Sequence, residues 1–212
     1  MKKEEVIDLI EKLKTEYPDA KCSLNFSTPF ELGIAVMLSA QCTDERVNKV
    51  TPLIFDKYNT PQAFIKLNLE EIEKMIYTCG FYKNKARNIK LYAEKIQNEY
   101  NGELPKTMKE LIKLPGIGRK SANVIMLEAF NNPCGIAVDT HAKRIANRIG
   151  LSKEKDPNKI EQDLLKIIPK EYYKDVNHLL VWHGRKTCIA QKPKCEICII
   201  KDRCNYYKQK NK

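Results

Sequence analysis

The stretch Leu114-Pro115-Gly116-Ile117-Gly118-Arg119-Lys120-Ser121-Ala122 decides the fold, because it lies between two segments whose apolar residues recur at helical spacing. Pro115 is expected to stop the first helix. Gly116 and Gly118 permit a tight hairpin whose bare backbone N–H groups can approach an anion at the start of the next helix. Arg119 adds positive charge at the same point. The stretch therefore predicts a phosphate-binding hairpin between two helices, with a purely structural turn as the alternative.

The charge of the chain supports a polyanionic partner. The 212 residues include 38 Lys and Arg against 27 Asp and Glu, which leaves a formal net charge of +11. Such an excess is typical of proteins that bind nucleic acid, although a lysine-rich composition can also produce it. Together with the charge, the stretch matches a helix-hairpin-helix element over about residues 107–130, which grips the DNA backbone without recognising bases.

Helical spacing of apolar residues continues through nearly the whole chain, for example over residues 6–13, and no strand alternation is convincing. The pairs Thr60-Pro61 and Asp156-Pro157 are typical of a helix N-cap followed by a first-turn proline, and Gly150 is placed where a helix should stop. The pattern predicts an all-α fold of about ten short helices.

Four cysteines near the end of the chain have the spacing C-x6-C-x2-C-x5-C: Cys188, Cys195, Cys198 and Cys204. Two cysteines separated by two residues can both reach one metal centre, and the flanking cysteines can complete the ligand set. A single C-x2-C pair with flanking cysteines is more typical of a cubane iron–sulfur cluster than of zinc, which more often uses two short pairs. We expect one 4Fe-4S cluster in the loop 188–204, with zinc or unliganded thiols as alternatives.

The other four cysteines lie singly among apolar residues and are predicted to be inert core residues: Cys22, Cys42, Cys79 and Cys134. No apolar leader follows Met1, and no apolar run approaches the length of about 18 residues that a membrane span requires. These features predict a cytoplasmic protein, associated with the nucleoid when bound to DNA, whose cysteines serve one metal site and the core rather than disulfides.

The residues 114–122, the run Val138-Asp139-Thr140-His141 and the cysteine tail together resemble the endonuclease III family of helix-hairpin-helix DNA glycosylases. The resemblance covers nearly the whole chain, and residues 38–44 and 80–82 also fall where that family carries DNA-contacting segments. It implies two helical domains with the DNA cleft between them. The first is expected over residues 22–132, and the second joins residues 1–21 to 133–212.

The resemblance implies that Lys120 is the nucleophile. Its amine would attack the sugar C1′, displace a damaged base and form a Schiff base, from which the 3′ phosphate leaves by β-elimination. A protonated amine cannot attack, so the site is expected to exclude water and to place cations such as Arg119 nearby. A simple phosphate contact is the alternative role for Lys120.

The resemblance also implies that Asp139 stabilises positive charge on the sugar as the base leaves and helps to move the proton of the nucleophile. The alternative from the residues alone is that Asp139 or Thr140 caps the following helix.

Flipping a nucleotide leaves a gap in the base stack, and the resemblance implies that Gln41 enters this gap while Phe81 wedges the opposite strand. Many family members carry leucine where this chain has Phe81, and core packing is the alternative role for that side chain. Ser39 and Asp44 are expected to line the base pocket. The remaining DNA contacts are expected at Gly116, Gly118, Arg119, Thr140, His141, Lys192 and Lys194.

The predicted activity is therefore removal of oxidised pyrimidines, followed by cleavage of the abasic strand. The expected partner is double-stranded DNA that contains damaged pyrimidines or abasic sites, and the chain is expected to act as a monomer without a membrane. Two alternatives stay open: a monofunctional mismatch glycosylase on the same scaffold, although such relatives generally lack lysine at position 120, and a non-catalytic DNA-binding module with a structural four-cysteine metal site.

Overall fold

The computed structural model describes residues 1–210, and these residues form twelve α-helices and three short 3-10 helices with no strand. The prediction of an all-α fold is confirmed. The helix number exceeds the predicted value of about ten because helices such as α7 (Met108–Leu111) and α12 (Asn205–Lys210) are too short to produce a clear apolar period.

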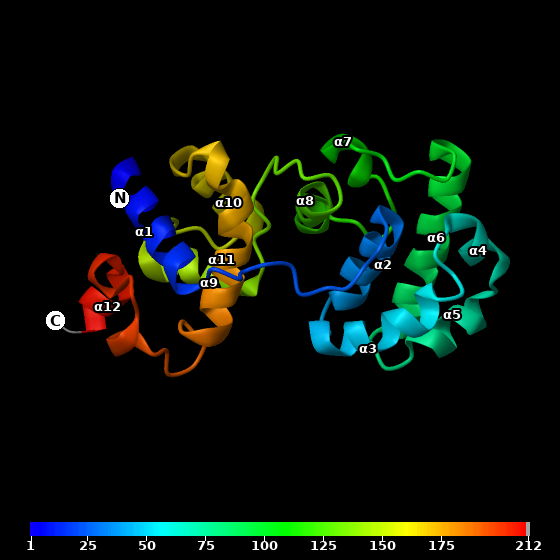
Figure 1. Cartoon of the computed structure of the whole chain (residues 1–212), viewed down its shortest axis with the longest axis horizontal. Helices are drawn as coiled ribbons and strands as arrows, with labels where there is room; N and C mark the ends of the chain where they lie inside the picture. The colour runs from blue at the N-terminus through cyan, green and yellow to red at the C-terminus, as the bar shows by residue number, and fades with distance from the viewer. Residues whose placement is uncertain (211–212) are drawn as a thin grey trace. The chain divides into compact units, whose positions relative to one another are not determined.

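The chain divides into two compact units, Ser23–Asn132 and Met1–Cys22 with Pro133–Lys212. We call the first the hairpin unit and the second the terminal unit, and Figure 1 colours their helices by position in the chain. Cys22 belongs to the terminal unit, one residue beyond the expected boundary between residues 21 and 22. The physical reason is that the indole Nε1 of Trp182 donates a hydrogen bond of 3.1 Å to the carbonyl of Lys21, which holds this end of the N-terminal segment to the terminal unit.

The hairpin unit is a set of helices around one apolar core. Its helices are α2 (Pro29–Ser39), α3 (Asp44–Phe55), α4 (Pro61–Lys66), α5 (Leu69–Ile76), α6 (Tyr82–Tyr100), α7 and α8 (Arg119–Glu128). The side chains of α2 are buried nearly all round, because this helix packs against α3, α6 and α8. The stacked rings of Phe30 and Tyr92, with centroids 5.4 Å apart, join α2 to α6 in the centre of the core.

The terminal unit has a second, separate core. Its elements are α1 (Lys3–Glu16), α9 (Thr140–Ile149), α10 (Pro157–Ile167), η1 (Lys170–Tyr172), α11 (Tyr173–Lys186), η2 (Cys195–Ile197), η3 (Lys201–Arg203) and α12. Helix α11 packs against both α1 and α9, so residues from the two ends of the chain share one core. Gly184 allows the close approach of α9, because a Cβ atom there would lie 2.8 Å from the Cβ of His141.

Local sequence signals set several helix ends. The Thr60 hydroxyl accepts from the Ala63 N–H at 3.2 Å, and the Asp156 carboxylate accepts from the N–H groups of Asn158 and Lys159. Gly150 ends α9 with a φ of 96°, a conformation that glycine adopts without strain. The predicted caps at these three positions are confirmed.

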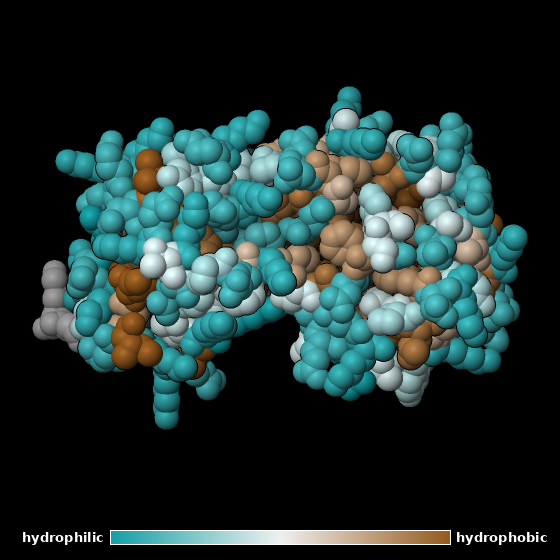
Figure 2. Space-filling model, viewed as in Figure 1, coloured by the Kyte–Doolittle hydropathy of each residue, from teal (hydrophilic) through white to brown (hydrophobic). Residues whose placement is uncertain are grey.

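Hydrophilic residues cover most of the face drawn in Figure 2. Over residues 1–210, no helix combines the length and the apolar character needed to cross a membrane.

Candidate functional site

The hairpin that follows α7 is anchored by two apolar side chains. Leu114 and Ile117 are buried, and the Ile117 N–H donates to the Leu114 carbonyl at 3.1 Å to close the turn. Gly116 and Gly118 are exposed between and after these anchors. The turn therefore presents bare backbone to solvent while its apolar residues hold it to the core of the hairpin unit.

The two glycines have different roles. Gly116 has a φ of 77°, and a Cβ atom there would lie 2.4 Å from the Sδ of Met37, so both conformation and space require glycine. Gly118 has a φ of −91°, which any residue adopts, and a Cβ atom there would meet no other atom within 4 Å. Gly116 therefore shapes the turn, whereas Gly118 contributes an uncovered backbone at the start of α8.

Lys120 lies in the first turn of α8 and its side chain is exposed. The N-cap of this helix is Gly118, which has no side chain to occupy the first N–H groups, so they face outward with the positive end of the helix dipole. Arg119, the first residue of the helix, is partly buried. The geometry places an amine beside a potential anion-binding helix start.

One pocket of the hairpin unit brings three of the predicted DNA contacts together. It is lined in part by Gln41, Phe81, Gly116 and Ser121, and its empty volume is about 620 Å³. Ser121 follows Lys120 directly, so the pocket adjoins the first turn of α8. Three segments far apart in sequence thus meet at one surface.

Gln41 and Phe81 share an unusual conformation. Their φ angles are 51° and 53°, in the left-handed region that non-glycine residues seldom adopt, and both side chains are exposed. Phe81 is 64% exposed, so the core-packing alternative for this residue is wrong. Strained, exposed residues on two neighbouring loops are typical of a binding surface.

The two predicted base-pocket residues lie on either side of the loop that carries Gln41. Ser39 ends α2 and its hydroxyl donates to the Val36 carbonyl at 2.9 Å, and Asp44 is the first residue of α3. Both are partly buried, and neither lines the pocket described above. Their role in a base pocket stays a prediction.

Asp139 is the N-cap of α9, and its carboxylate Oδ1 accepts from the Ala142 N–H at 2.7 Å. The capping alternative is therefore confirmed for Asp139. Asn177, which the sequence did not reveal, positions the preceding segment: its side chain accepts from the Ala137 N–H at 2.7 Å and donates to the Gly135 carbonyl. One carboxylate oxygen is committed to the cap, which leaves the other to act elsewhere.

Thr140 is exposed at the first position of α9, whereas His141 is partly buried. The Nη2 of Arg144 lies 3.1 Å from the Nδ1 of His141. Burial, opposed by the charge of Asp139, holds the pKa of His141 below its usual value. His141 is therefore a neutral, hydrogen-bonded residue near neutral pH rather than a cation.

The four tail cysteines line a single cavity of the terminal unit, next to Arg148 and His183. Burial raises the pKa of the Cys198 thiol to about 11, so metal binding there must displace a proton. Among residues 1–210, no three His, Cys, Asp or Glu side chains converge closely enough to hold a single metal ion.

Two side chains from the helices touch the cysteine sulfurs. Arg148 Nη1 lies 3.3 Å from the Sγ of Cys188 and also donates to the Ile189 carbonyl at 2.7 Å. His183 Nε2 lies 3.7 Å from the Sγ of Cys198, while its Nδ1 lies 3.0 Å from the hydroxyl of Tyr17. Burial lowers the pKa of His183 to about 4, so the ring is neutral and supplies one donor and one acceptor. His183 is thus a neutral residue that links the Tyr17 hydroxyl to the sulfur of Cys198.

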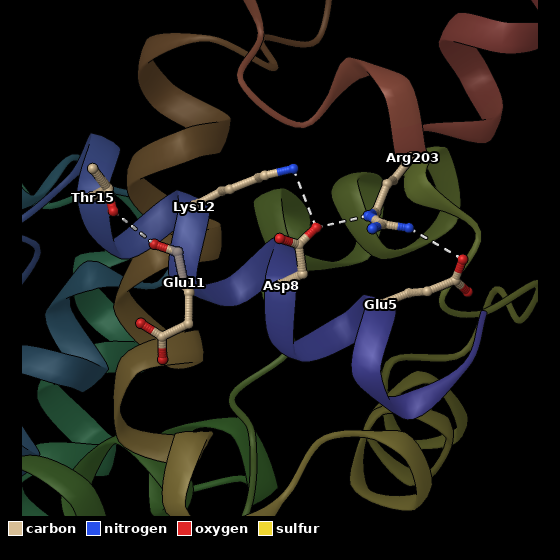
Figure 3. Close-up of polar contacts among 6 residues, drawn as sticks. All are labelled: Glu5, Asp8, Glu11, Lys12, Thr15 and Arg203. Carbon is tan, nitrogen blue, oxygen red and sulfur yellow. Dashed lines mark hydrogen bonds and ion pairs between the residues drawn. The ribbon is translucent and has the colours of Figure 1, made fainter.

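The end of the cysteine loop is fixed to the N-terminal helix by Arg203, as Figure 3 shows. Its guanidinium donates to Asp8 at 2.8 Å and to Glu5 at 3.1 Å. Lys12 forms a further ion pair with Asp8 at 3.2 Å. Because these carboxylates are solvent-exposed, the pairs add modest stability, but they set the position of the residue that precedes Cys204.

The two lysines of the loop between Cys188 and Cys195 are both exposed. Lys192 has a φ of 50°, and the backbone N–H of Lys194 donates to the Thr187 carbonyl at 3.0 Å. The loop therefore holds two cations at the surface, and their contact with a phosphate stays a prediction.

The prediction that the other four cysteines are buried is wrong for three of them. Cys79 is fully buried, but Cys22 and Cys42 are only partly buried and Cys134 is exposed. Apolar sequence neighbours did not determine burial here, because all four cysteines lie in connections between helices and only the side chain of Cys79 is buried in a core.

Comparisons with known proteins agree with this geometry. Residues 34–170 match the family described as HhH-GPD superfamily base excision DNA repair protein, and residues 188–204 match the iron-sulfur binding domain of endonuclease III. The chain is 45% identical to endonuclease III of Synechocystis sp. over 96% of this chain and 93% of that protein. It is 44% identical to endonuclease III of Escherichia coli (strain K12), over 97% of each chain.

Two solved structures are similar over the whole chain. The structure of a non-covalent endonuclease III–DNA complex has a TM-score of 0.94 and 43% identity, and covers 100% of this chain and 99% of that one. The structure of a trapped endonuclease III–DNA covalent intermediate has the same TM-score and identity and covers 100% of both chains.

Proposed function

The chain belongs to the endonuclease III family of helix-hairpin-helix base excision DNA repair proteins, and on that premise we propose that it removes oxidised pyrimidines from duplex DNA and cleaves the abasic strand. Its activity class is that of a DNA glycosylase and abasic-site lyase, and it carries a 4Fe-4S cluster. We infer that it acts in the cytoplasm and is associated with the nucleoid when it is bound to DNA. The observation that carries the proposal is Lys120, an exposed amine in the first turn of the helix that follows the hairpin.

The chemistry assigned to Lys120 takes place in two stages. The neutral amine attacks C1′ of the damaged nucleoside, the C1′–N bond breaks, and the base leaves with a proton. The C1′–O4′ bond then breaks, O4′ takes up a proton, and the opened sugar carries an iminium at C1′. The iminium makes a C2′ proton acidic, and removal of that proton expels the 3′ phosphate. Hydrolysis of the imine then releases the sugar and restores the amine.

Asp139 is assigned the stabilisation of positive charge on the sugar while the base departs. Its Oδ1 accepts the Ala142 N–H in the cap, and this bond fixes the orientation of the carboxylate. Asn177 fixes the backbone before it. A carboxylate held in this way needs little reorganisation during the reaction.

Gln41 and Phe81 are assigned to the gap that the flipped nucleotide leaves and to the opposite strand. Both side chains are exposed on loops next to the pocket that also includes Gly116. Gly116, Gly118 and Arg119 are assigned to the phosphates near Lys120, with further contacts at Thr140, His141, Lys192 and Lys194 and base-pocket roles for Ser39 and Asp44.

The cluster is assigned to Cys188, Cys195, Cys198 and Cys204, whose sulfurs supply all its protein ligands. When bound, it provides a rigid link among distant parts of the loop. Arg148 and His183 hold this loop through their contacts with Cys188 and Cys198. These contacts of Arg148 and His183 keep Lys192 and Lys194 in position to bind a phosphate.

The experiment that tests the proposal is borohydride trapping on a duplex with one thymine glycol and on an abasic duplex. The wild-type protein, Lys120→Ala and Lys113→Ala are compared, since Lys113 is another exposed lysine of the hairpin. We expect covalent adducts with the wild type and Lys113→Ala and none with Lys120→Ala. Trapping of Lys120→Ala would exclude Lys120 as the nucleophile. An absence of trapping in all three would favour a monofunctional glycosylase or a binding module.

A further inference from the structure

The loops that carry Gln41 and Phe81 are in contact through a pair of cysteines. Cys42 follows Gln41 directly, and Cys79 lies two residues before Phe81. Beside the larger effect of burial, the thiol of Cys42 is close enough to that of Cys79 to help raise the Cys79 pKa. Both are present as free thiols, Cys42 partly buried and Cys79 fully buried.

Further contacts hold the same two loops together. The ammonium of Lys85 on α6 donates to the Leu38 carbonyl at 2.8 Å and to the Cys79 carbonyl at 2.7 Å, and the residue is only 6% exposed. A Cβ atom on Gly80 would lie 3.7 Å from the Gln41 carbonyl oxygen, so the two backbones are close. The thiols are therefore kept side by side by a framework that does not depend on them.

We propose that Cys42 and Cys79 form a reversible disulfide that links the Gln41 loop to the Phe81 loop. The two cysteines adjoin Gln41 and Gly80, whose backbones lie in contact, and their sulfur atoms need to approach to the bonding distance of about 2.05 Å. Cysteines of the cluster loop are distant in sequence and bound to iron, whereas this pair has no ligand role.

The oxidant is a low-molecular-weight disulfide. The accessible Cys42 thiolate attacks one of its sulfurs, forms a mixed disulfide and releases one thiol molecule after proton transfer. The Cys79 thiolate then attacks the sulfur of Cys42 and releases the second thiol molecule. Two protein thiols are oxidised, and one small disulfide is reduced to two thiols.

The charge of Lys85 favours this chemistry. Burial raises the pKa of the Cys79 thiol, and the nearby Lys85 ammonium opposes that rise. Burial also lowers the pKa of Lys85 itself, while the neighbouring thiols oppose this change. A thiolate formed at either cysteine therefore has a cation beside it.

The consequence of the disulfide rests on the proposed function. A disulfide adds a covalent link to the Lys85 contacts and keeps its two Cα atoms about 4.4 to 6.8 Å apart, so the Gln41 and Phe81 loops lose freedom to adjust to the strands of a duplex. The oxidised protein is then expected to bind a duplex with a gap in its base stack with lower affinity. Reduction leaves only the noncovalent Lys85 contacts between the loops, which can adjust when DNA binds.

The test uses the full chain with its cluster, treated with oxidised glutathione and then digested for mass spectrometry without reduction. The wild type is compared with Cys42→Ala and with Cys134→Ala, in which an exposed cysteine away from the pair is removed. Visible absorption of the cluster is followed throughout, so that samples with a damaged cluster are set aside. Binding to an abasic duplex is measured before oxidation, after it, and after dithiothreitol.

We expect a peptide with linked Cys42 and Cys79 in the wild type and Cys134→Ala, and no such peptide in Cys42→Ala. Affinity for the abasic duplex should fall about tenfold on oxidation and return with dithiothreitol, with no change in Cys42→Ala. Glutathione on Cys42 without a link to Cys79 would overturn the disulfide. A link without a change in affinity would overturn its effect on DNA. If the reduced protein fails to bind while the link forms, the proposed function fails and the disulfide stands.

Discussion

The hairpin at residues 114–118 and the cysteine loop at residues 188–204 both present backbone and charge at a surface, but different interactions hold them. The hairpin is anchored by Leu114 and Ile117, which are buried in the core of its unit. Within the described structure of the cysteine loop, Ile200 is the one apolar side chain of the core, and Ile197 is 77% exposed. The comparison teaches that core packing is sufficient for the first region, whereas the second depends on its cluster and on polar contacts.

The largest effect should follow removal of a cluster ligand. Cys198→Ala should lose the cluster and with it roughly 5 kcal/mol or more of local stability in residues 188–204, because ligand binding and folding are coupled in such loops. Hydrogen–deuterium exchange should rise throughout this loop and stay unchanged over residues 107–130. A colourless variant with wild-type protection in the loop would show that polar contacts alone hold it.

The hairpin does not depend on a cluster, and it should be destabilised by a substitution that its backbone conformation does not tolerate. Gly116→Ala combines a φ of 77° with a contact of 2.4 Å to Met37 Sδ, and should destabilise the protein by about 2 to 3 kcal/mol in urea unfolding.

Gly118→Ala is the matched control, because a Cβ atom there meets nothing within 4 Å. It should stay within about 0.5 kcal/mol of the wild type in stability yet bind duplex DNA more weakly, since the methyl group covers backbone at the start of α8. Equal loss of stability in both variants would contradict the distinction between the two glycines.

Substitutions of Asp139 test whether one residue of the terminal unit has both a structural and a chemical role. Asp139→Ala should lose about 1 to 2 kcal/mol in thermal or urea unfolding, because the Ala142 N–H loses its acceptor. Asp139→Asn should keep the cap and most of that stability.

Both Asp139 variants should show a lower kcat on a thymine glycol duplex with little change in binding, because the charge is needed only as the base departs. A wild-type kcat for Asp139→Asn would leave capping as the sole role of the residue.

The smallest effect is expected from the polar support of the cysteine loop. Tyr17→Phe removes the hydroxyl that lies 3.0 Å from His183 Nδ1 and 2.8 Å from Thr187 Oγ1, and should cost about 0.5 to 1 kcal/mol. The loss should appear as faster hydrogen exchange near Thr187 and Cys188. Unchanged exchange there would indicate that water replaces the hydroxyl without cost.

The sequence by itself determined the features that depend on local chemistry. Helical periodicity, the caps at Thr60 and Asp156 and the spacing of the four tail cysteines are all written within a few residues of the chain. The same is true of the hairpin, because proline and glycine restrict or free the backbone at their own positions. For that reason the all-α fold and the candidate cluster loop could be predicted without coordinates.

The tertiary structure alone decided which distant residues meet. Lys85 is buried where it bonds the carbonyls of Leu38, which is distant in sequence, and of Cys79, which is near. Asn177 supports the segment before Asp139, and Arg148 contacts Cys188, in each case across 40 positions of the chain. The exposure of Phe81 and the conformation of Gly118 were likewise open in the sequence. Side-chain burial and long-range hydrogen bonds depend on how the helices pack, and periodicity along one helix does not specify its neighbours.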